Sequence, residues 1–260
     1  MAGSIAISVE GGIARLVLTN PERRNAISAG MWRAISAFAQ DAARRTDIRV
    51  ALLRGDGDLA FSGGADISDF DSARSDASGA QSYDDLVEQA CSALEGLAFP
   101  TVALVKGACV GAGAALAASC DMRVAAEDAF FAIPAARLGL GYDPRGLGRI
   151  LRVFGSQGAR QLFFTADRVS AARAHTLGAV DALAPAMDVD AAAERLLQRI
   201  AENAPLTLKA AKLAIRATET GAGSLLGEAR RATTVANASA DYGEGRRAFS
   251  EKRAPRFTGS

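Results

Sequence analysis

The chain has 260 residues, of which 49% are hydrophobic, and 30 Lys and Arg residues nearly balance 29 Asp and Glu residues. A chain of this length and composition can bury a large core as one domain with an appendage. The net charge of +1 excludes a broad attraction to nucleic acid or to an anionic membrane surface, so any anion must be bound locally. No basic region followed by an apolar segment opens the sequence, and no apolar run is long enough to span a bilayer. We therefore expect a cytoplasmic protein with neither a nucleic-acid nor a membrane partner.

Strand and helix patterns alternate through the first part of the chain. Apolar runs predict strands at 5–9, 13–18, 50–53 and 101–105, and helical patterns cover 29–44, 84–97 and 111–118. This alternation implies an α/β core of parallel strands joined by crossovers, with Ser28 as the N-cap of the first helix. Segment 69–85 is rich in Ser, Asp, Gly and Ala, so we predict a mobile surface loop or a marginal helix there.

The last part of the chain predicts helices alone. Strand patterns end at about Asp188, and helices are expected at 191–202, 206–218 and 225–240, with Pro205 in the first turn of the second. The cysteines are odd in number, lie in apolar sequence and lack metal-ligand spacing, so we expect reduced core residues and no metal site. They are Cys91, Cys109 and Cys120.

Two glycine-rich turns point to chemistry. Phe61-Ser62-Gly63-Gly64-Ala65-Asp66 follows the 50–53 strand, and Gly111-Ala112-Gly113 leads from the 101–105 strand region into a helix. Such turns leave backbone N–H groups without partners, and these groups suit an oxygen that gains negative charge. Two donors would form an oxyanion hole; the alternatives are close packing or a phosphate cradle. A dinucleotide fingerprint is excluded because Leu116 replaces the third glycine, and the chain has no Gly-Lys-Ser/Thr.

Several further segments stand before, around and after these turns in the chain. They are Asn20-Pro21-Glu22-Arg23-Arg24-Asn25-Ala26, Lys106-Gly107 through Cys120-Asp121, Arg137-Leu138-Gly139-Leu140-Gly141, Phe164-Thr165-Ala166-Asp167-Arg168-Val169-Ser170-Ala171, Leu177-Gly178-Ala179-Val180 and Glu244 through Arg253. With Phe61–Asp66, these segments resemble the crotonase superfamily, the enoyl-CoA hydratase/isomerase family, over nearly the whole chain.

The resemblance implies a fold, an assembly and a substrate class. The fold would be a spiral of repeated β-β-α units, with an acyl-CoA site in a core at 1–187 and a helical region at 188–260 that packs on neighbouring subunits. The assembly would be a homotrimer or a dimer of trimers. The substrate would be an acyl-CoA thioester, so that CoA enters with the substrate and no separate cofactor is implied. Segment 69–85 would form one wall of the acyl pocket.

The chemistry shared by the family is stabilisation of a thioester enolate by two backbone N–H donors. The positions that match these donors are Ala65 and Ala112. Glycine is usual at the second position. Alanine keeps the amide there and is tolerated if its φ is negative.

Other residues match the family's CoA and substrate contacts. Arg23 and Arg24 stand where relatives bind the CoA nucleotide, although ordinary surface arginine is the alternative. Phe249 and Lys252 are expected to reach the same nucleotide from the tail, in some relatives from a neighbouring subunit. The turn residues assigned to this site are Ala26, Gly64, Asp66, Ile67 and Gly111, and Asp66 and Asp121 match positions that order the turns.

The acid–base residues depart from the family's hydratases, which add water with two glutamates. The matching positions hold Ala115 and Ala135, and alanine can neither orient water nor donate a proton. Asp143 matches an aspartate that some family isomerases use as acid and base and that aromatic dehalogenases use as nucleophile. Its alternative role is to cap the helix that begins near Pro144. If Asp143 faces an apolar pocket, desolvation would raise its pKa. Tyr142 would either add a hydroxyl to that pocket or serve as a partly buried aromatic beside the turn.

Three hypotheses follow. The first is an acyl-CoA enzyme of the hydratase/isomerase family, with double-bond isomerisation by Asp143 as the specific prediction and hydration by other groups as its alternative. The second is an acyl-CoA binder without catalysis. The third is displacement on an aryl- or acyl-CoA with Asp143 as nucleophile, for which Phe130 and Phe131 offer aromatic surface. No histidine lies near the first turn to act as its base, and we interpret the only histidine, His175, as structural.

Overall fold

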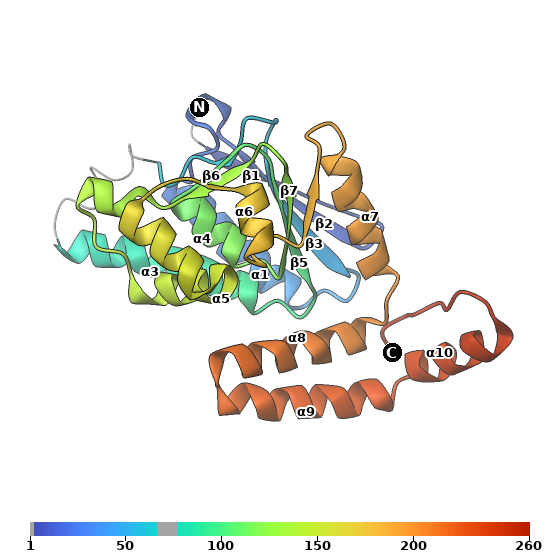
Figure 1. Ribbon diagram of the computed structural model, residues 1–260. Helices are drawn as coiled ribbons and strands as arrows, with labels where there is room; N and C mark the ends of the chain where they lie inside the picture. The colour runs from blue at the N-terminus through green and yellow to red at the C-terminus, as the bar shows by residue number, and fades with distance from the viewer. Residues whose placement is uncertain (1–2, 67–76) are drawn as a thin grey trace.

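The structure, a computed structural model, describes residues 3–66 and 77–260, and these residues form two β-sheets and a set of helices (Figure 1). The main sheet has the strand order β1 (Ser4–Glu10), β2 (Ile13–Thr19), β3 (Val50–Gly55), β5 (Thr101–Val105), β7 (Met122–Ala126) and β10 (Ala182–Ala184). The second sheet has the order β4 (Ala60–Ser62), β6 (Ala108–Val110), β8 (Phe130–Ala132) and β9 (Val169–Ser170).

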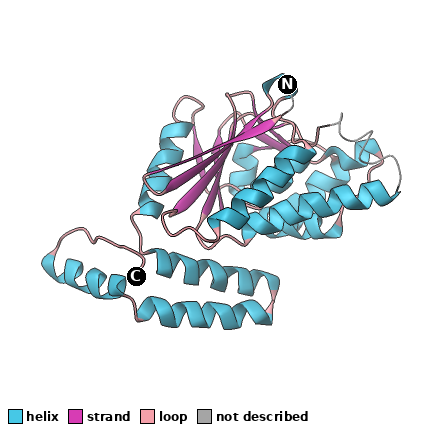
Figure 2. Ribbon diagram, turned by 180° about the vertical axis from the view of Figure 1, so that it is seen from behind, coloured by secondary structure: helices cyan, strands magenta, loops and turns pink. Residues whose placement is uncertain are grey.

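Pairing in the main sheet is parallel from β2 onward, as the alternation of strands and helices predicts. The exception is the hairpin of β1 and β2, which pair antiparallel across Gly11 and Gly12. Both glycines have a positive φ, 58° and 80°, and a link this short can join only antiparallel strands. Every residue of β5 is buried, because it lies between other strands and has helices on both sides of its sheet (Figure 2).

Successive strands alternate between the two sheets. β3, β5 and β7 enter the main sheet, and the strand that follows each of them, β4, β6 or β8, enters the second sheet. Helices then carry the chain to the next turn. This arrangement confirms the predicted α/β spiral of repeated β-β-α units. It also places the ends of β4 and β6, and therefore both glycine-rich turns, side by side, because β4 and β6 pair with each other.

The helices of the core are α1 (Ala29–Ala42), α3 (Ala77–Glu95), α4 (Ala112–Ala118), α5 (Pro144–Arg160), α6 (Ala171–Thr176) and α7 (Val189–Ala201). Ser28 caps α1 as predicted, since its side chain accepts a hydrogen bond from the Met31 N–H. The described part of segment 69–85 is helical, because α3 begins at Ala77 and not at Asp84. The rest of the predicted loop, up to residue 76, lies outside the described residues.

The C-terminal helices divide into two groups. α7 packs against β3, β5, β7 and β10 and so belongs to the core. The helices α8 (Pro205–Thr220), α9 (Gly223–Asn237) and α10 (Ala240–Glu251) form an extension, here called the C-terminal arm, that projects below the core in Figure 1. Pro205 is the first residue of α8, as predicted. Within the described residues, no helix combines the length and the apolar character needed to cross a membrane.

One buried lysine ties the arm to the core. Lys212 on α8 donates hydrogen bonds to the Phe99 carbonyl at 3.0 Å and to Asp121 Oδ2 at 2.7 Å. The same carboxylate oxygen accepts bonds from the Thr101 N–H and hydroxyl at 2.7 and 2.8 Å. Asp121 therefore joins α8 to the start of β5, a structural role in keeping with its predicted one.

Candidate active site

The first glycine-rich turn follows β4 and is fixed on both sides of Ala65. Gly64 has a φ of 113°, which favours glycine, and its carbonyl accepts a hydrogen bond from the Ile27 N–H at 2.7 Å. The Asp66 N–H donates to the Ile27 carbonyl at 3.0 Å. The Ala65 N–H itself has no hydrogen-bond acceptor among the residues that the structure describes.

The second turn joins β6 to α4. Its left-handed φ of 55° falls on Gly111, and Ala112 is the first helical residue, so alanine is tolerated at 112 without strain. Gly111 is held in place because its N–H donates to the Ala132 carbonyl at 2.8 Å. As a first-turn amide, the Ala112 N–H has no acceptor in its own helix, and none occurs elsewhere in the described chain.

The two turns are in contact. A Cβ on Gly64 would lie 3.3 Å from the Val110 carbonyl oxygen, and a Cβ on Gly111 would lie 4.0 Å from the Gly64 Cα. A Cβ on Gly113 would lie 2.7 Å from the Ser62 Cβ, which is closer than side chains pack. Glycine at these positions allows the two turns to approach each other closely, and this approach places Ala65 and Ala112 in neighbouring turns. Both alanines are half-buried.

A basic cavity of about 460 Å³ opens beside these turns. Gly63 from the first turn and Val110 from the second turn both line it. The charged residues in its wall are Glu22, Arg23, Arg24, Arg137 and Arg168. A wall with four guanidinium groups and one carboxylate favours an anionic ligand such as a phosphate.

The arginines of the cavity differ in their surroundings. The Arg23 guanidinium forms an ion pair with the buried Asp66, so Arg23 and Asp66 help to order the first turn. Arg24 has a left-handed φ of 51°, and its carbonyl accepts a bond from the Gly63 N–H at 2.7 Å. Ala26, the next assigned residue, is buried just before Ile27. Ile67 lies outside the described residues.

Two of the four arginines were not predicted. Arg168 lies over the ring of Phe130 with its guanidinium carbon 4.3 Å from the ring centre, and Arg137 pairs with Asp167 at 2.7 Å. Both arginines fall inside segments that carry the family resemblance. Their positive charge within those segments was the one feature of the sequence that could have identified them as anion-binding residues. Their closeness to Arg23 and Arg24 depends on the pairing of β6 with β8.

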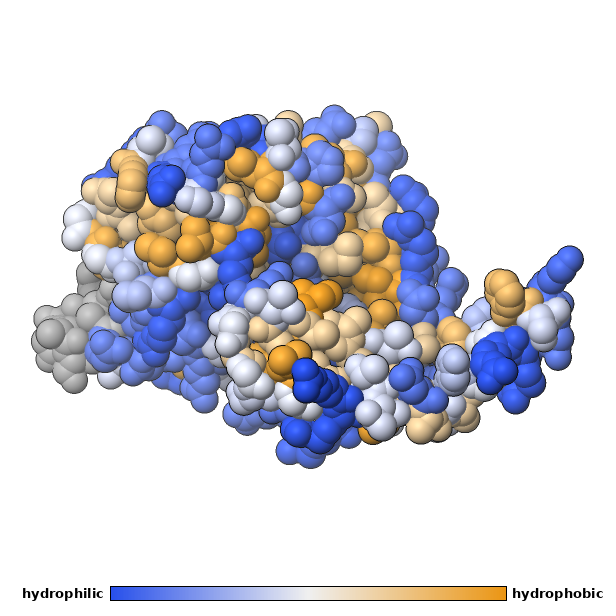
Figure 3. Space-filling view, turned by 60° about the horizontal axis from the view of Figure 1, so that its bottom comes forward, coloured by the Kyte–Doolittle hydropathy of each residue, from blue (hydrophilic) through white to orange (hydrophobic). Residues whose placement is uncertain are grey.

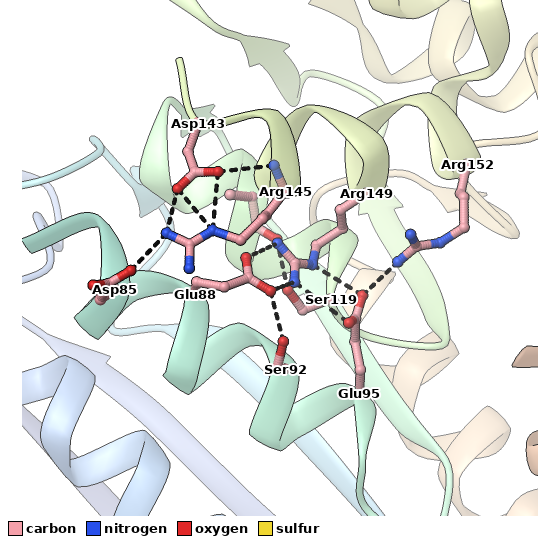
Figure 4. Close-up of polar contacts among 10 residues, drawn as sticks. Asp85, Glu88, Ser92, Glu95, Ser119, Asp143, Arg145, Arg149 and Arg152 are labelled. Carbon is pink, nitrogen blue, oxygen red and sulfur yellow. Dashed lines mark hydrogen bonds and ion pairs between the residues drawn. The ribbon is translucent and has the colours of Figure 1, made fainter. Parts of the chain in front are cut away.

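Asp143 is the N-cap of α5, which confirms its predicted capping role. Its Oδ1 accepts a hydrogen bond from the Arg145 N–H at 2.8 Å, and the Arg145 Nε lies 3.1 Å from Oδ1 and 2.9 Å from Oδ2 (Figure 4). Hydrogen bonds from the Arg145 side chain hold the pKa of Asp143 below its usual value, and partial burial does not offset them. The expectation of a raised pKa is therefore wrong. The Asp143 side chain remains 21% exposed.

Tyr142, Ala115 and Ala135 supply no charged group to the site. Tyr142 packs edge-on against Phe163 with ring centres 4.8 Å apart, and burial raises the pKa of its phenol, which stays neutral. Ala115 and Ala135 are both buried, at 4% and 7% exposure. Their methyl groups leave no ionisable side chain at either position.

The tail residues do not meet the basic cavity within one chain. Phe249 is 88% exposed on α10, and Lys252 follows as its left-handed C-cap. α10 lies at the outer part of the C-terminal arm, away from the core (Figure 1). A single chain therefore does not bring Phe249 or Lys252 to Arg23 and Arg24.

His175 lies exposed on α6 and contacts the backbone, whereas Phe131 and the cysteines are buried. His175 Nδ1 lies 2.7 Å from the Val180 carbonyl oxygen. Phe131 is fully buried against Phe154, so only Phe130 reaches the cavity. All three cysteines are buried, and burial raises the pKa of the Cys91 thiol to about 11 and that of Cys120 to about 12. These thiols are inert.

Comparisons with known proteins agree with this arrangement. The sequence profile of the enoyl-CoA hydratase/isomerase family matches residues 8–260. A 2,3-dehydroadipyl-CoA hydratase from Escherichia coli K12 is 30% identical over 98% of each chain. An enoyl-CoA isomerase/hydratase from Mycosarcoma maydis is 33% identical over 95% of this chain and 93% of its own.

Solved structures match over the same length. The crystal structure of an enoyl-CoA hydratase/carnithine racemase from Magnetospirillum magneticum superposes with a TM-score of 0.91, at 31% identity, over 98% of this chain and 96% of that one. Sequence and fold thus agree over nearly the full length. The chain belongs to the enoyl-CoA hydratase/isomerase (crotonase) family.

Proposed function

We propose that this protein isomerises the double bond of an enoyl-CoA, with Asp143 as the group that removes and returns the proton. Family membership supports an acyl-CoA enzyme, but relatives named as hydratases and as isomerases both match the chain. The choice between the two reactions depends on side chains. The observation that carries the proposal is a carboxylate at Asp143, bound by Arg145, together with methyl groups at Ala115 and Ala135.

The oxyanion hole is formed by the N–H groups of Ala65 and Ala112 in this proposal. When a proton leaves the carbon next to a thioester carbonyl, negative charge collects on the carbonyl oxygen. Two preorganised N–H donors stabilise this charge, and the loss of one donor in other enzymes costs about 3 kcal/mol of transition-state stabilisation. The contact between Gly64 and Gly111 supports the pairing of these donors.

The proton transfer needs only one carboxylate. From a 3-enoyl-CoA, Asp143 takes the proton at C2, and the electron pair of that C–H bond passes into a dienolate whose oxygen accepts the two N–H bonds. The neutral Asp143 then returns the proton to C4, which leaves the double bond between C2 and C3. No water is added and no second acid is required, in contrast to hydration.

The basic cavity supports binding of the CoA portion of the substrate. Arg24 and Arg168 would bind phosphate groups there, and the half-buried ring of Phe130 lies beneath the Arg168 guanidinium. In this arrangement the thioester enters between the two turns while the nucleotide stays near the cavity mouth. No metal or redox cofactor takes part in the proposed reaction.

The test is to incubate the protein with 2-enoyl- and 3-enoyl-CoA thioesters in heavy-oxygen water and to follow both double-bond position and product mass. We expect the double bond to move without gain of heavy oxygen. Heavy oxygen in the product would establish hydration instead. Tight binding without turnover of any substrate would establish a binder.

The variant Asp143→Asn separates the proposed role of Asp143 from helix capping. Asparagine still caps helices but cannot take a proton, so we expect isomerisation to fall by about a hundredfold or more with little change in acyl-CoA affinity. Asp47→Asn is the control, because the Asp47 carboxylate is also bound by an arginine two residues away, Arg45, which here precedes the aspartate. Equal activity of Asp143→Asn and wild type would contradict the role.

We further propose a homotrimer or a dimer of trimers. Figure 3 shows hydrophobic atoms scattered among polar ones on the arm. Several large apolar side chains of this arm are exposed. They include Ile215, Leu226, Val235 and Phe249. Packing of this arm on a neighbouring core would also bring Phe249 and Lys252 to a CoA nucleotide. Light scattering should give three or six times the mass of the chain; the mass of one chain would contradict the assembly.

A further inference from the structure

A ladder of ion pairs joins α5 to α3 (Figure 4). Arg149 and Arg152 on α5 bind carboxylates of α3: Arg149 Nε lies 2.9 Å from Glu95, Arg149 Nη2 lies 3.1 Å from Glu88, and Arg152 Nη2 lies 2.7 Å from Glu95. The arginines lie at helical spacing on one face of α5. These pairs fix α5, and therefore its N-terminal residue Asp143, against α3.

Arg145, also on α5, differs from these two arginines because it binds carboxylates of two separate segments. Its Nη2 lies 2.8 Å from Asp85 on α3 and 2.5 Å from Asp143 Oδ2, while its Nε contacts both oxygens of Asp143. One guanidinium thus bridges two carboxylates from segments sixty residues apart. Arg149 and Arg152, by contrast, bind only carboxylates of α3.

We propose that Arg145 is a positioning residue that holds Asp143 as an oriented carboxylate and that Asp85 retains Arg145 as its ion-pair partner while Asp143 carries the substrate proton. This inference rests on the proposed function, in which Asp143 takes and returns a proton. It assigns to Asp85 and Arg145 a role in that transfer. Neither residue touches the substrate in this proposal.

The physical reason lies in charge balance. Before transfer, the guanidinium carries one positive charge between two carboxylates. When Asp143 takes the proton from C2, its charge is lost, and without Asp85 the Arg145 cation would lose its counter-ion. Asp85 already lies within hydrogen-bond distance of the Arg145 guanidinium, so Arg145 keeps an ion-pair partner. Protonation of Asp143 therefore costs less free energy. Return of the proton to C4 restores the bridge.

The other charged groups near Asp143 lie on α5 and α3. Arg149, one turn further along α5, also favours the carboxylate form of Asp143, and it is itself paired with Glu88 and Glu95. Asp84 and Asp85 lie on α3, and Gln81 donates a hydrogen bond to Asp85 at 3.1 Å. Among these groups, Arg145 is the one whose ion pairing would change: it pairs with both Asp143 and Asp85 before the proton transfer and with Asp85 alone after it.

Two variants are expected to shift the pKa of Asp143 in opposite directions. Arg145→Gln removes the cation, so the pKa of Asp143 should rise by about one unit, and the acid limb of kcat/KM should move to higher pH by the same amount. Asp85→Asn removes the competing anion, so the pKa of Asp143 should fall and the acid limb of kcat/KM should move to lower pH. In this variant kcat should also fall, because Asp143 becomes a weaker base. Arg145→Lys keeps the charge and should leave the limb near its wild-type position.

Arg152→Gln is the matched control. It removes another ion pair between α5 and α3 without touching Asp143, so its acid limb should stay in place even if the protein loses some stability. A common shift of Arg145→Gln and Arg152→Gln would mean that the ladder acts only through the fold and would overturn the inference. Melting temperatures of all variants identify any that fail to fold. If Arg145→Gln does not fold, the comparison rests on Asp85→Asn, whose acid limb should move to lower pH, and an unmoved limb would overturn the inference.

A measurement without substrate separates the inference from the proposed function. Carbon-13 NMR of aspartate carboxyl groups, with Asp143→Asn used for assignment, gives the Asp143 pKa in the resting protein. An unchanged pKa in Arg145→Gln overturns the inference, while an inactive Asp143→Asn leaves the proposed function standing. A different outcome would be opposite pKa shifts of Asp143 in Arg145→Gln and Asp85→Asn together with a fully active Asp143→Asn. This outcome would reject the proposed function and also the role of Arg145 and Asp85 in turnover.

Discussion

Gly113 of the second glycine-rich turn packs directly on Ser62 of the first: a Cβ at position 113 would lie 2.7 Å from the Ser62 Cβ and 2.9 Å from the Ser62 carbonyl oxygen. No real side chain fits at this distance, so the two turns can approach only because position 113 is glycine. The spacing between the Ala65 and Ala112 amides depends on this contact.

Gly113→Ala should therefore separate the turns. We expect a loss of stability of about 1–3 kcal/mol from overpacking and a larger relative fall in kcat/KM, because the two N–H donors would no longer converge. Gly148→Ala on α5 is the control, since a Cβ there meets no atom within 4 Å. Thermal unfolding and kinetics measure the two effects, and equal activity of the Gly113→Ala variant would argue against the paired donors.

Arg24→Gln tests the basic cavity. Hydrogen bonds to charged groups contribute about 1.5–3 kcal/mol, so we expect KM for an acyl-CoA to rise about tenfold or more. KM for the matching N-acetylcysteamine thioester, which lacks the nucleotide, should not change. Arg173→Gln, at an exposed position on α6, serves as the control. An equal rise for both substrates would place Arg24 outside the nucleotide site.

Lys212→Met tests the tie between the C-terminal arm and the core. Lys212 is buried, and its loss leaves Asp121 and the Phe99 carbonyl without their cation. Because Asp121 is 28% exposed, we expect a loss of about 2 kcal/mol, less than for a fully buried pair. Lys209→Met on the same helix is exposed and should be neutral. Chemical denaturation measures both variants, and a neutral Lys212→Met would show that the arm is held elsewhere.

Acid should release the C-terminal tail. Hydrogen bonds from Arg253, helped by the Arg256 N–H, lower the pKa of Glu244 from its ordinary 4.5 to about 2. A lowered folded-state pKa stabilises the docked tail above pH 4.5, and this contribution is lost as the pH falls toward 2. The Arg256 amide signal should follow this titration in NMR spectra.

Glu244→Gln should abolish this dependence and should speed tryptic cleavage after Arg253 at pH 7. Glu228→Gln, at an exposed position on α9, is the control. A pH-independent Arg256 signal in the wild-type protein would show that Glu244 does not hold the tail.

Local patterns were sufficient for much of the core. The strand predicted at 101–105 agrees with β5 at both ends, and the cap at Ser28 and the helix start at Pro205 also agree. These features depend on neighbours in the chain: a fully apolar run, a hydroxyl before a helix, and a ring that fixes φ.

The sequence left open whether segment 69–85 is a loop or a marginal helix, because the support for the first turns of α3 is distant. Residues from Ala77 onward are small and polar, with little local preference for a buried helix. Tyr83 in this segment is buried and accepts a hydrogen bond from Trp32 Nε1 on α1 at 3.3 Å. Contacts of this kind, between segments fifty residues apart, cannot be seen in the periodicity of one segment.

Motif residues and their order along the chain were enough to identify the family, the two glycine-rich turns and the carboxylate at position 143, because these are local properties. The charge state of that carboxylate depends on the folded chain around it. Sequence alone allowed a raised pKa in an apolar pocket or a helix cap for Asp143. Folding places Arg145 between Asp143 and Asp85, and the energy of a charge depends on its neighbours in space.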